Sequence, residues 1–365
     1  MIRTATLEDL DALVKLEEIC FDYDRLSRRN FRYLLTKGNE VTLVDEVNNH
    51  IRGYAMVLFN MGTSLARMYS IAVNPKYRGQ GIGESLMLEA ETVALEHDCV
   101  SIRLEVRRDN ESTIRLYKKL GYRQFGEYDD YYEDHMQALR FEKRLTPDVQ
   151  GDLAPVPYYE QTLEFTCGPA TLMMAMKALQ PEYEFSRTEE IRLWRESTTV
   201  FMTAGHGGCG PYGLALSADH RGFDVEVYVS DEGALFVDSV RNQEKKEVIR
   251  IVQHDFLEEI HKKNIPIFYE QLTLDAMKQK FEQGGIPVVL ISSYRIYQEK
   301  FPHWVVVTGF DERFIYVHDP YVDYEANKTQ TDVVNMPITQ KDFARMARYG
   351  KTGLRAAIML FKRKD

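Results

Sequence analysis

The chain reads Arg78-Gly79-Gln80-Gly81-Ile82-Gly83 between an apolar strand that ends at Val73 and an amphipathic helix that begins at Glu84. Glycines at alternate positions let successive backbone N–H groups point into one concavity. The positive end of the following helix favours an anion at the same place. The loop therefore predicts a pyrophosphate site; the alternative is a glycine-rich turn without a ligand.

Spacing excludes two other kinds of phosphate-binding loop. A P-loop needs a lysine and then a serine or threonine after its last glycine, whereas Glu84 follows Gly83 here. The dinucleotide-binding fingerprint needs two residues before its third glycine, whereas Ile82 alone precedes Gly83. The loop therefore needs another explanation.

Helix and strand periods alternate on both sides of the loop up to about residue 145, which predicts a mixed α/β domain. A strand is expected over 101–106 and a helix over 110–120. Alternate residues of the strand are aliphatic, so Glu105 lies on its other face, where it is either solvated or lines a cleft. Tyr117, on the helix, is either a core aromatic or a proton donor.

The glycine-rich loop resembles the acetyl-coenzyme A (acetyl-CoA) signature of the GNAT acetyltransferases, and the resemblance covers about residues 1–145. Two further runs, 104–122 and 131–136, are similar to the RimI branch, which acetylates protein N-termini. The resemblance implies acetyl-CoA as cosubstrate and a peptide or protein amine as acceptor. It gives Glu105 the removal of the amine proton and Tyr117 the protonation of the leaving thiolate, which suit a carboxylate and a phenol.

The same resemblance implies which residues hold acetyl-CoA. Backbone groups of Ile71 and Val73 are expected to pair with the pantetheine arm and hold the thioester carbonyl, and Asn110 is expected to contact the same arm. The full expected set is Ile71, Val73, Arg78, Gly79, Gln80, Gly81, Ile82, Gly83 and Asn110.

A stretch without periodicity separates this domain from the rest of the chain. Residues 146–157 concentrate proline, glycine and acids, which is typical of a linker or an extended crossing. We expect one domain over 1–146, a linker over 147–155 and a second domain over 156–365.

The second domain contains a cysteine at the start of an apolar helix, in the run Gln161-Thr-Leu-Glu-Phe-Thr-Cys167-Gly-Pro-Ala. Unpaired N–H groups and the positive end of the helix dipole favour a thiolate at this position. Pro169 suits the first turn of a helix. Cys167 is therefore either a nucleophile or a buried structural cysteine.

A histidine and an aspartate are expected to meet across a hairpin. His303 opens an apolar strand, and a second strand ends just before Asp319. If the turn is centred on Asp311, His303 lies directly opposite Asp319, with Cβ atoms roughly 5 Å apart. The carboxylate then orients the imidazole as a base, whereas a lone histidine would be structural. His318 points to the other face from Asp319 and is a weaker candidate.

The runs around Cys167, His303 and Asp319 resemble those of the bacteriocin-processing peptidases, a family of papain-like cysteine peptidases. The resemblance covers about residues 155–362. The resemblance implies a papain-like fold in which Cys167 is the nucleophile, His303 the base and Asp319 the residue that orients the base. It also makes Gln161 the donor of a hydrogen bond to the oxyanion.

Two further features lie near these motifs. Thr166 stands where the resembled family often has an acid before the cysteine. His206 and Cys209 lie three residues apart, but two ligands are too few for a metal site. We interpret that run as a glycine-rich turn lining the cleft, and we expect no metal.

Composition limits the functional classes. A chain of 365 residues is too long for a single hydrophobic core of ordinary size, so its length favours two or three domains. A net charge of −10 argues against a nucleic-acid-binding surface. No apolar run approaches a membrane span and the N-terminus lacks the apolar core of a signal peptide, so we expect a cytoplasmic protein that does not enter a membrane. The sequence does not indicate the oligomeric state.

These patterns predict an α/β and α+β protein, in which a GNAT acetyltransferase domain is followed by a papain-like cysteine peptidase domain. We expect a bifunctional acyl-transfer enzyme that acetylates an N-terminal or lysine amine and hydrolyses an amide bond of peptides or proteins, as in peptide maturation. The alternative is a papain-like domain that binds peptides without hydrolysis or performs transpeptidation.

Overall fold

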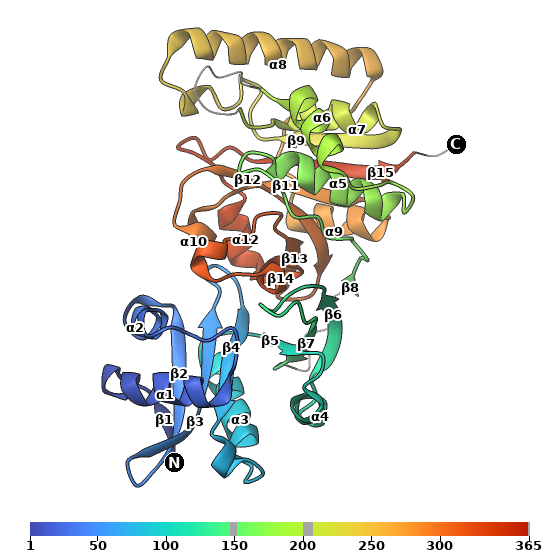
Figure 1. The fold of residues 1–365 in the computed structure, drawn as a ribbon. Helices are drawn as coiled ribbons and strands as arrows, with labels where there is room; N and C mark the ends of the chain where they lie inside the picture. Colours follow the sequence, from blue (N-terminus) through green and yellow to red (C-terminus); the bar gives the residue numbers. More distant parts are fainter. Residues whose placement is uncertain (147–151, 200–206, 364–365) are drawn as a thin grey trace. The chain divides into compact units, whose positions relative to one another are not determined.

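The computed structural model describes residues 1–146, 152–199 and 207–363. The chain divides into two compact units, Met1–Val149 and Gln150–Asp365. Of the predicted linker 147–155, residues 147–151 lie outside the described residues. The next two residues form the short strand β8 (Asp152–Leu153), which belongs to the second unit (Figure 1). Among the described residues, no helix is long and apolar enough to cross a membrane.

The described part of the first unit contains a seven-stranded sheet in the order β1-β2-β3-β4-β5-β7-β6. Its strands are β1 (Ile2–Thr4), β2 (Glu40–Val47), β3 (His50–Phe59), β4 (Leu65–Val73), β5 (Ser101–Arg107), β6 (Arg123–Tyr128) and β7 (Ala138–Arg144). Its helices are α1 (Leu10–Cys20), α2 (Arg28–Lys37), α3 (Ile82–Glu96) and α4 (Glu111–Lys119). Alternate residues of β3 enter two separate cores: Tyr54 packs with α1 and α2, and Ala55 packs with α3.

Two strands at the centre of this sheet pair over only part of their length. β4 and β5 are the one parallel pair among the described strands of this sheet, and their register runs from Leu65 opposite Ser101 to Met68 opposite Leu104. β4 continues to Val73, where the chain enters the glycine-rich loop. Beyond Met68 the two strands do not pair, so the sheet opens next to that loop.

The described part of the second unit contains an eight-stranded sheet in the order β10-β9-β15-β11-β12-β13-β14, and β8 pairs with β12. Its remaining strands are β9 (Phe223–Val229), β10 (Ile267–Phe268), β11 (Ile286–Ser292), β12 (Pro302–Phe310), β13 (Phe314–His318), β14 (Met336–Thr339) and β15 (Ala356–Lys362). Its helices are α5 (Cys167–Leu179), α6 (Arg187–Ser197), α7 (Pro211–Asp219), α8 (Gln243–Lys263), α9 (Leu274–Glu282), α10 (Tyr294–Tyr297), α11 (Gln330–Val333) and α12 (Gln340–Met346).

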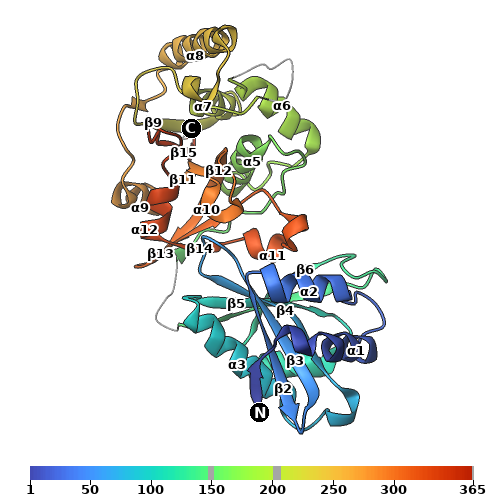
Figure 2. The same ribbon diagram turned by 90° about the vertical axis from the view of Figure 1, so that its left-hand side faces the viewer.

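Helices cover both faces of this second sheet. Trp304 and Val306 of β12 pack into the core that α5 and α7 complete, whereas Val305 packs into the core on the side of α9 and α12. Figure 2 shows α5 and α9 on opposite sides of the sheet. The nearly continuous apolar run of β12 follows from this double burial.

The register predicted for the β12–β13 hairpin is wrong. Val306 pairs with His318, and a bulge after Val307 shifts the pairs nearer the turn. The predicted turn centre, Asp311, instead precedes the turn, and its Oδ1 accepts hydrogen bonds from the N–H groups of Arg313 and Phe314 at 2.7 and 2.6 Å. His303 therefore does not lie directly opposite Asp319, which follows the last residue of β13.

Candidate active sites in the two units

The glycine-rich loop of the first unit leaves an open concave backbone at the start of α3. Gly79 and Gly81 adopt φ angles of 77° and 79°, and a Cβ atom on either would meet nothing within 4 Å. Gly81 is the N-cap of α3. The described residues offer no hydrogen-bond partner to the backbone N–H groups of residues 79–84. These N–H groups, including that of Gln80, suit an anionic ligand such as a pyrophosphate.

The loop adjoins the end of β4. A Cβ atom on Gly83 would meet side-chain carbons of Val73 and Leu116 at 3.7 Å. The Val73 carbonyl accepts hydrogen bonds from Arg78 Nε at 3.1 Å and from the Cys20 thiol at 3.5 Å. These two side chains therefore engage the carbonyl of Val73, one of the residues whose backbone groups were predicted to pair with the pantetheine arm.

The other predicted acetyl-CoA residues lie on three elements of this unit. Ile71 pairs with Ala55 in the β3–β4 ladder, on the part of β4 that has no β5 partner. Ile82 is the first residue of α3 and is buried. Asn110 caps α4, where its side-chain oxygen accepts hydrogen bonds from the Thr113 N–H at 3.2 Å and the Ser112 hydroxyl at 3.1 Å.

Glu105 is held in a buried ion pair. Arg67 Nε donates to Glu105 Oε2 at 3.0 Å, and only 3% of the Arg67 side chain and 5% of the Glu105 side chain are exposed. Arg67 also donates to the Tyr131 hydroxyl at 3.2 Å. Glu105 is therefore not a solvated surface residue, and its carboxylate lies on the part of β5 that does not pair with β4.

Tyr117 lies in the core on the α3 side of the sheet. Its ring contacts Tyr122 and Phe141, with ring centroids 5.7 and 6.3 Å apart, and the side chain is almost fully buried. Burial raises the pKa of the Tyr117 phenol above its usual value. The phenol therefore stays protonated at neutral pH, which is the form that a proton donor requires.

In the second unit, Cys167 is the first residue of α5 and is partly exposed, whereas residues 168–176 of the helix are buried. The N-cap, Thr166, makes no side-chain cap to the helix. A Cβ atom on Gly168 would approach Cys209 Cβ to 3.2 Å and Leu214 to 3.3 Å, so α7 packs tightly on α5 at this glycine. The thiol lies at a helix N-terminus, as the sequence predicted.

His303 and Asp319 form a buried pair despite the different register. His303 Nε2 donates to Asp319 Oδ1 at 2.6 Å, and neither side chain is appreciably exposed. Asp319 also accepts hydrogen bonds from the Tyr321 N–H at 2.9 Å and from the Tyr297 hydroxyl at 2.7 Å. The aspartate is thereby fixed by three donors and fixes the imidazole in turn.

The electrostatics of this pair favour a charged imidazole. Burial lowers the pKa of His303, but the carboxylate of Asp319 and the thiol of Cys167 outweigh it and raise the pKa to about 10. The Cys167 thiol is thus one of the groups that raise the pKa of the ring. Because Nε2 is engaged by Asp319, Nδ1 is the nitrogen that remains for the thiol. This arrangement can support an imidazolium–thiolate pair.

Gln161 lies between the two halves of this site. Its backbone N–H donates to the Pro320 carbonyl at 2.9 Å, next to Asp319. Its side-chain Nε2 donates to the Leu163 carbonyl at 2.8 Å, and its Oε1 is buried without a hydrogen-bond partner among the described residues. The amide predicted to face an oxyanion is therefore directed at Leu163 in this structure.

His318 has a structural role. Its Nε2 donates to the Val156 carbonyl at 2.9 Å, and its Nδ1 accepts a hydrogen bond from the Asn335 N–H at 2.9 Å. Both ring nitrogens are thus used by the backbone. Its rejection as the base agrees with these contacts.

Three residues that the sequence analysis did not single out complete the two sites: Arg67, Tyr297 and Glu190. Arg67 and Tyr297 hold the carboxylates of Glu105 and Asp319, as described above. Glu190, on α6, accepts hydrogen bonds from the segment before Cys167. The sequence could have indicated Glu190, because this carboxylate shares the buried face of an amphipathic helix with Leu193.

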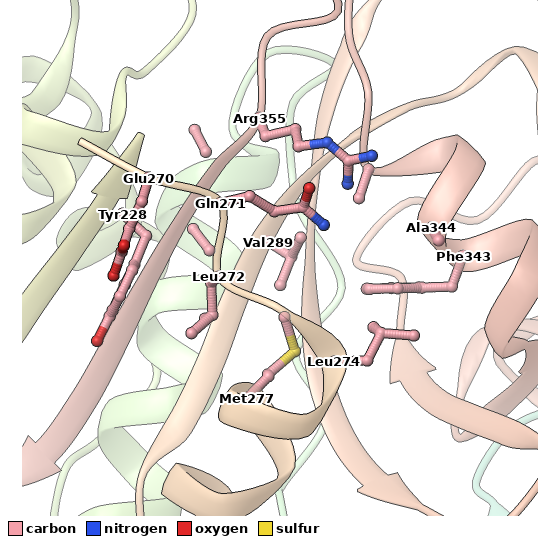
Figure 3. Close-up of a pocket in the computed structure, with 13 residues that line it drawn as sticks. Tyr228, Glu270, Gln271, Leu272, Leu274, Met277, Val289, Phe343, Ala344 and Arg355 are labelled. Atoms are coloured by element: carbon pink, nitrogen blue, oxygen red, sulfur yellow. The ribbon is translucent and has the colours of Figure 1, made fainter. Parts of the chain in front are cut away.

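Two other features of the second unit are the run that contains His206 and a pocket in the second sheet. His206 lies outside the described residues, and residues 1–146, 152–199 and 207–363 contain no group of three or more side chains that could hold a metal ion. A pocket near β11, α9 and α12 has apolar walls that include Val289, Met277 and Phe343, with Arg355 and Gln271 above them (Figure 3). No candidate catalytic residue lines this pocket.

Comparisons with known proteins match both parts of the chain. A model of the Peptidase_C39 like family matches residues 156–361, and a model of the acetyltransferase (GNAT) family matches residues 9–122. A protein of Bacillus subtilis, named "Putative ribosomal protein bS18-alanine N-acetyltransferase", is 33% identical over 134 residues, which cover 37% of this chain and 87% of that protein.

Two further similarities concern acetyltransferases. The thialysine N-epsilon-acetyltransferase of Sus scrofa is 30% identical over 155 residues, which cover 41% of this chain and 88% of that protein. The crystal structure of the ribosomal-protein-S18-alanine N-acetyltransferase from Escherichia coli is 21% identical, with a TM-score of 0.37, and the match covers 41% of this chain and 98% of that one.

Proposed function

We propose that this chain acetylates a peptide or protein amine and carries a second, thiol-dependent site that cleaves amide bonds. The chain belongs to the Peptidase_C39 like family through residues 156–361 and to the GNAT acetyltransferase family through residues 9–122. The acetyltransferase class follows from family membership. The acceptor, the roles of individual residues and the whole of the thiol chemistry are proposals.

The acetyl transfer is supported above all by the open glycine-rich loop at the start of α3, next to the place where β4 and β5 cease to pair. N–H groups of residues 79–84 would hold the pyrophosphate of acetyl-CoA, which supplies the activated acetyl group. Glu105 accepts the proton that the acceptor amine loses, directly or through water. Tyr117 gives its proton to the thiolate that leaves as the carbonyl carbon bonds to nitrogen.

The acceptor is proposed to be the N-terminal amine of a protein, because the Bacillus subtilis relative is named for a ribosomal protein alanine. The test uses radiolabelled acetyl-CoA with a peptide that begins with the N-terminal alanine sequence of bS18. Transfer is expected with the native chain and not with a Glu105→Gln, Tyr117→Phe variant. Equal label in both samples would contradict the proposal. The name of the Sus scrofa relative makes thialysine the second acceptor to test.

The thiol site is supported by the buried pair of His303 and Asp319, by the effect of Cys167 on the pKa of His303, and by the place of Cys167 at the start of α5. Cys167 sulfur attacks an amide carbonyl, the amine leaves with a proton from His303, and water then hydrolyses the thioester. Mass spectrometry of cellular peptides from strains with native chain or Cys167→Ala would test this activity. Peptide pools that do not differ would contradict it.

One observation favours a second candidate, a domain that binds peptides without cleaving them. Gln161 Nε2 donates to Leu163, so the proposed oxyanion donor is already engaged. Alkylation of Cys167 by iodoacetamide distinguishes the two functions: a catalytic thiol should react much more slowly after His303→Ala. A rate that His303→Ala does not change would favour the binding domain.

A further inference from the structure

A buried carboxylate outside the proposed catalytic set contacts the segment that leads to Cys167. Glu190 lies in the first turn of α6, and its side chain has no exposed surface. Among the described residues no cation pairs with it. A carboxylate buried without a cation is costly unless its lone pairs are satisfied by hydrogen bonds.

Four donors satisfy the two oxygens of Glu190. Oε1 accepts hydrogen bonds from the Thr162 N–H at 2.8 Å and from the Thr166 hydroxyl at 2.5 Å. Oε2 accepts them from the Thr162 hydroxyl at 2.6 Å and from the Tyr159 hydroxyl at 3.0 Å. A carboxylate offers about four lone-pair positions, so these donors fill it. All four belong to the segment 159–166.

The carbonyl of Leu163 indicates where the Thr166 hydroxyl donates. This carbonyl lies within hydrogen-bond distance of Gln161 Nε2 at 2.8 Å, the Thr166 N–H at 3.2 Å and the Thr166 hydroxyl at 2.8 Å. A carbonyl has two lone pairs, which the two N–H donors fill. The single hydroxyl proton of Thr166 is therefore best directed at Glu190, whose two oxygens then accept all four hydrogen bonds.

The segment that Glu190 holds carries two residues of the proposed thiol site. Gln161 is next to Thr162, and Cys167 follows Thr166. On its other side the segment is tied to the Asp319 loop through the hydrogen bond from the Gln161 N–H to Pro320. A shift of the segment would therefore move Gln161 relative to Cys167 and to the loop that carries Asp319.

We propose that Glu190 is a positioning residue of the thiol site, which fixes the backbone of the segment that carries Gln161 and leads to Cys167. The proposal rests on the thiol chemistry proposed above. Thr166 stands where the peptidases that this domain resembles often have an acidic residue. In this chain a carboxylate also lies at that place, but it is the carboxylate of Glu190 on α6, which accepts a hydrogen bond from Thr166. Glu190 itself does not contact the reacting atoms.

The test measures acylation of the full chain by p-nitrophenyl acetate. Cys167 sulfur bonds to the acetyl carbon, the ester C–O bond breaks, and the p-nitrophenolate released in the burst is followed by absorbance. Glu190→Gln replaces one carboxylate oxygen by an NH2 group, which cannot accept the two hydrogen bonds that the segment 159–166 donates to that oxygen. We expect the acylation rate constant to fall about 10- to 100-fold, which is less than the roughly 10²- to 10³-fold loss on removing an oxyanion donor, because Glu190→Gln shifts the segment and removes no donor from the site. Alkylation by iodoacetamide, which needs no oxyanion donor, should fall less.

The matched control is Glu189→Gln on the same helix. Glu189 accepts hydrogen bonds from Arg221 and from the Tyr183 hydroxyl, and it does not contact the segment 159–166. We expect this variant to lower the Tm in a similar way while its acylation rate stays within about two-fold of the native value. If Glu190→Gln does not fold, Thr162→Val takes its place, because it removes one donor at an exposed residue and should slow acylation more weakly.

The outcomes separate this proposal from the proposed function. A native burst that is absent from Cys167→Ala, together with slow acylation in Glu190→Gln or Thr162→Val, supports both. A native burst that neither variant slows overturns the positioning role alone. Equal loss of acylation and alkylation in proportion to a lowered Tm shows a purely structural role and also overturns it. A native chain without a Cys167-dependent burst overturns the thiol chemistry and the positioning role together.

Discussion

Two ion pairs on β5 have similar chemistry but different positions in the first unit. Glu105 pairs with Arg67 of β4, and Arg103 pairs with Glu142 of β7 at 2.9 Å. Both arginines are almost fully buried. Only Glu105 lies on the part of β5 that β4 does not pair with. The second pair can therefore serve as a control for the stability that the first provides.

We expect Glu105→Gln to lower kcat for acetyl transfer by about 10²- to 10⁴-fold, because the amine then lacks a base. Both Glu105→Gln and Glu142→Gln should lower the free energy of unfolding by about 1–3 kcal/mol, because each leaves a buried arginine with a weaker partner. Steady-state kinetics and thermal melts check the prediction. An equal loss of kcat in the two variants would show that Glu105 acts through stability alone.

The pKa of His303 gives the second unit a defined pH dependence. The folded-state value of about 10 lies above the ordinary value of 6.5. The pair with Asp319 therefore stabilises the fold fully below about pH 6.5 and loses this contribution as the pH rises through 10. In Asp319→Asn the imidazole lacks its carboxylate, so this contribution is absent at every pH.

The native chain should therefore exceed Asp319→Asn in Tm by about 5 °C or more at pH 6, and the difference should shrink steadily toward pH 10. Melting curves at half-unit steps of pH measure it. Other groups that titrate in the same range act in both proteins and cancel in the difference. A difference in Tm that is constant from pH 6 to pH 10 would mean that His303 carries no raised pKa.

At the scale of elements, the hairpin of β12 and β13 shows what a sequence pattern can predict. The two apolar runs indicated the strands, and His303 and Asp319 were expected to be neighbours. The bulge after Val307 and the turn capped by Asp311 were not predicted, because they depend on local hydrogen bonds that carry no periodicity. The hydrogen bond between His303 and Asp319 forms although the predicted register is wrong.

The start of α3 yields a prediction about ligand binding. Gly81 has a φ of 79° and open space around its Cα. Gly81→Ala should cost about 1–2 kcal/mol of stability, because alanine disfavours this backbone. The same substitution should raise the KM for acetyl-CoA by about 10- to 100-fold, because the altered loop misplaces N–H groups that bind the pyrophosphate.

Gly222→Ala is the matched control for this substitution. Gly222 has a φ of 86° and nothing within 4 Å of a Cβ atom, but it lies in the second unit, between α7 and β9. We expect it to lower the stability of its own unit similarly and to leave the KM for acetyl-CoA unchanged. A KM that Gly81→Ala does not alter would argue against a pyrophosphate at the loop.

For the whole molecule, the predicted order of a GNAT domain followed by a peptidase-like domain is confirmed by the family matches. This part was predictable because loop spacing and strand–helix alternation are local signals. The contacts of the supporting residues were not predictable, because Arg67, Tyr297 and Glu190 reach their partners from other elements over 22 to 38 positions of sequence. The roles of Cys167 and Glu105 remain predictions.

The two units should work independently. The buried clusters of the first unit contain no residue of the second, and the reverse also holds for the described residues. Each site therefore belongs to a unit with buried clusters of its own. We expect Cys167→Ala to keep kcat/KM for acetyl transfer within about two-fold of the native value, and Glu105→Gln to keep the iodoacetamide rate of Cys167 within the same range.

Both measurements are made on the full chain, with each variant serving as the control for the other. Saturating acetyl-CoA during alkylation adds a second condition, because a ligand that binds one unit shifts the other only if it distinguishes two states of that unit. We expect the alkylation rate to be the same with and without acetyl-CoA. A change larger than about five-fold would correspond to a coupling free energy of about 1 kcal/mol between the sites, and would show that acetylation and thiol chemistry are regulated together.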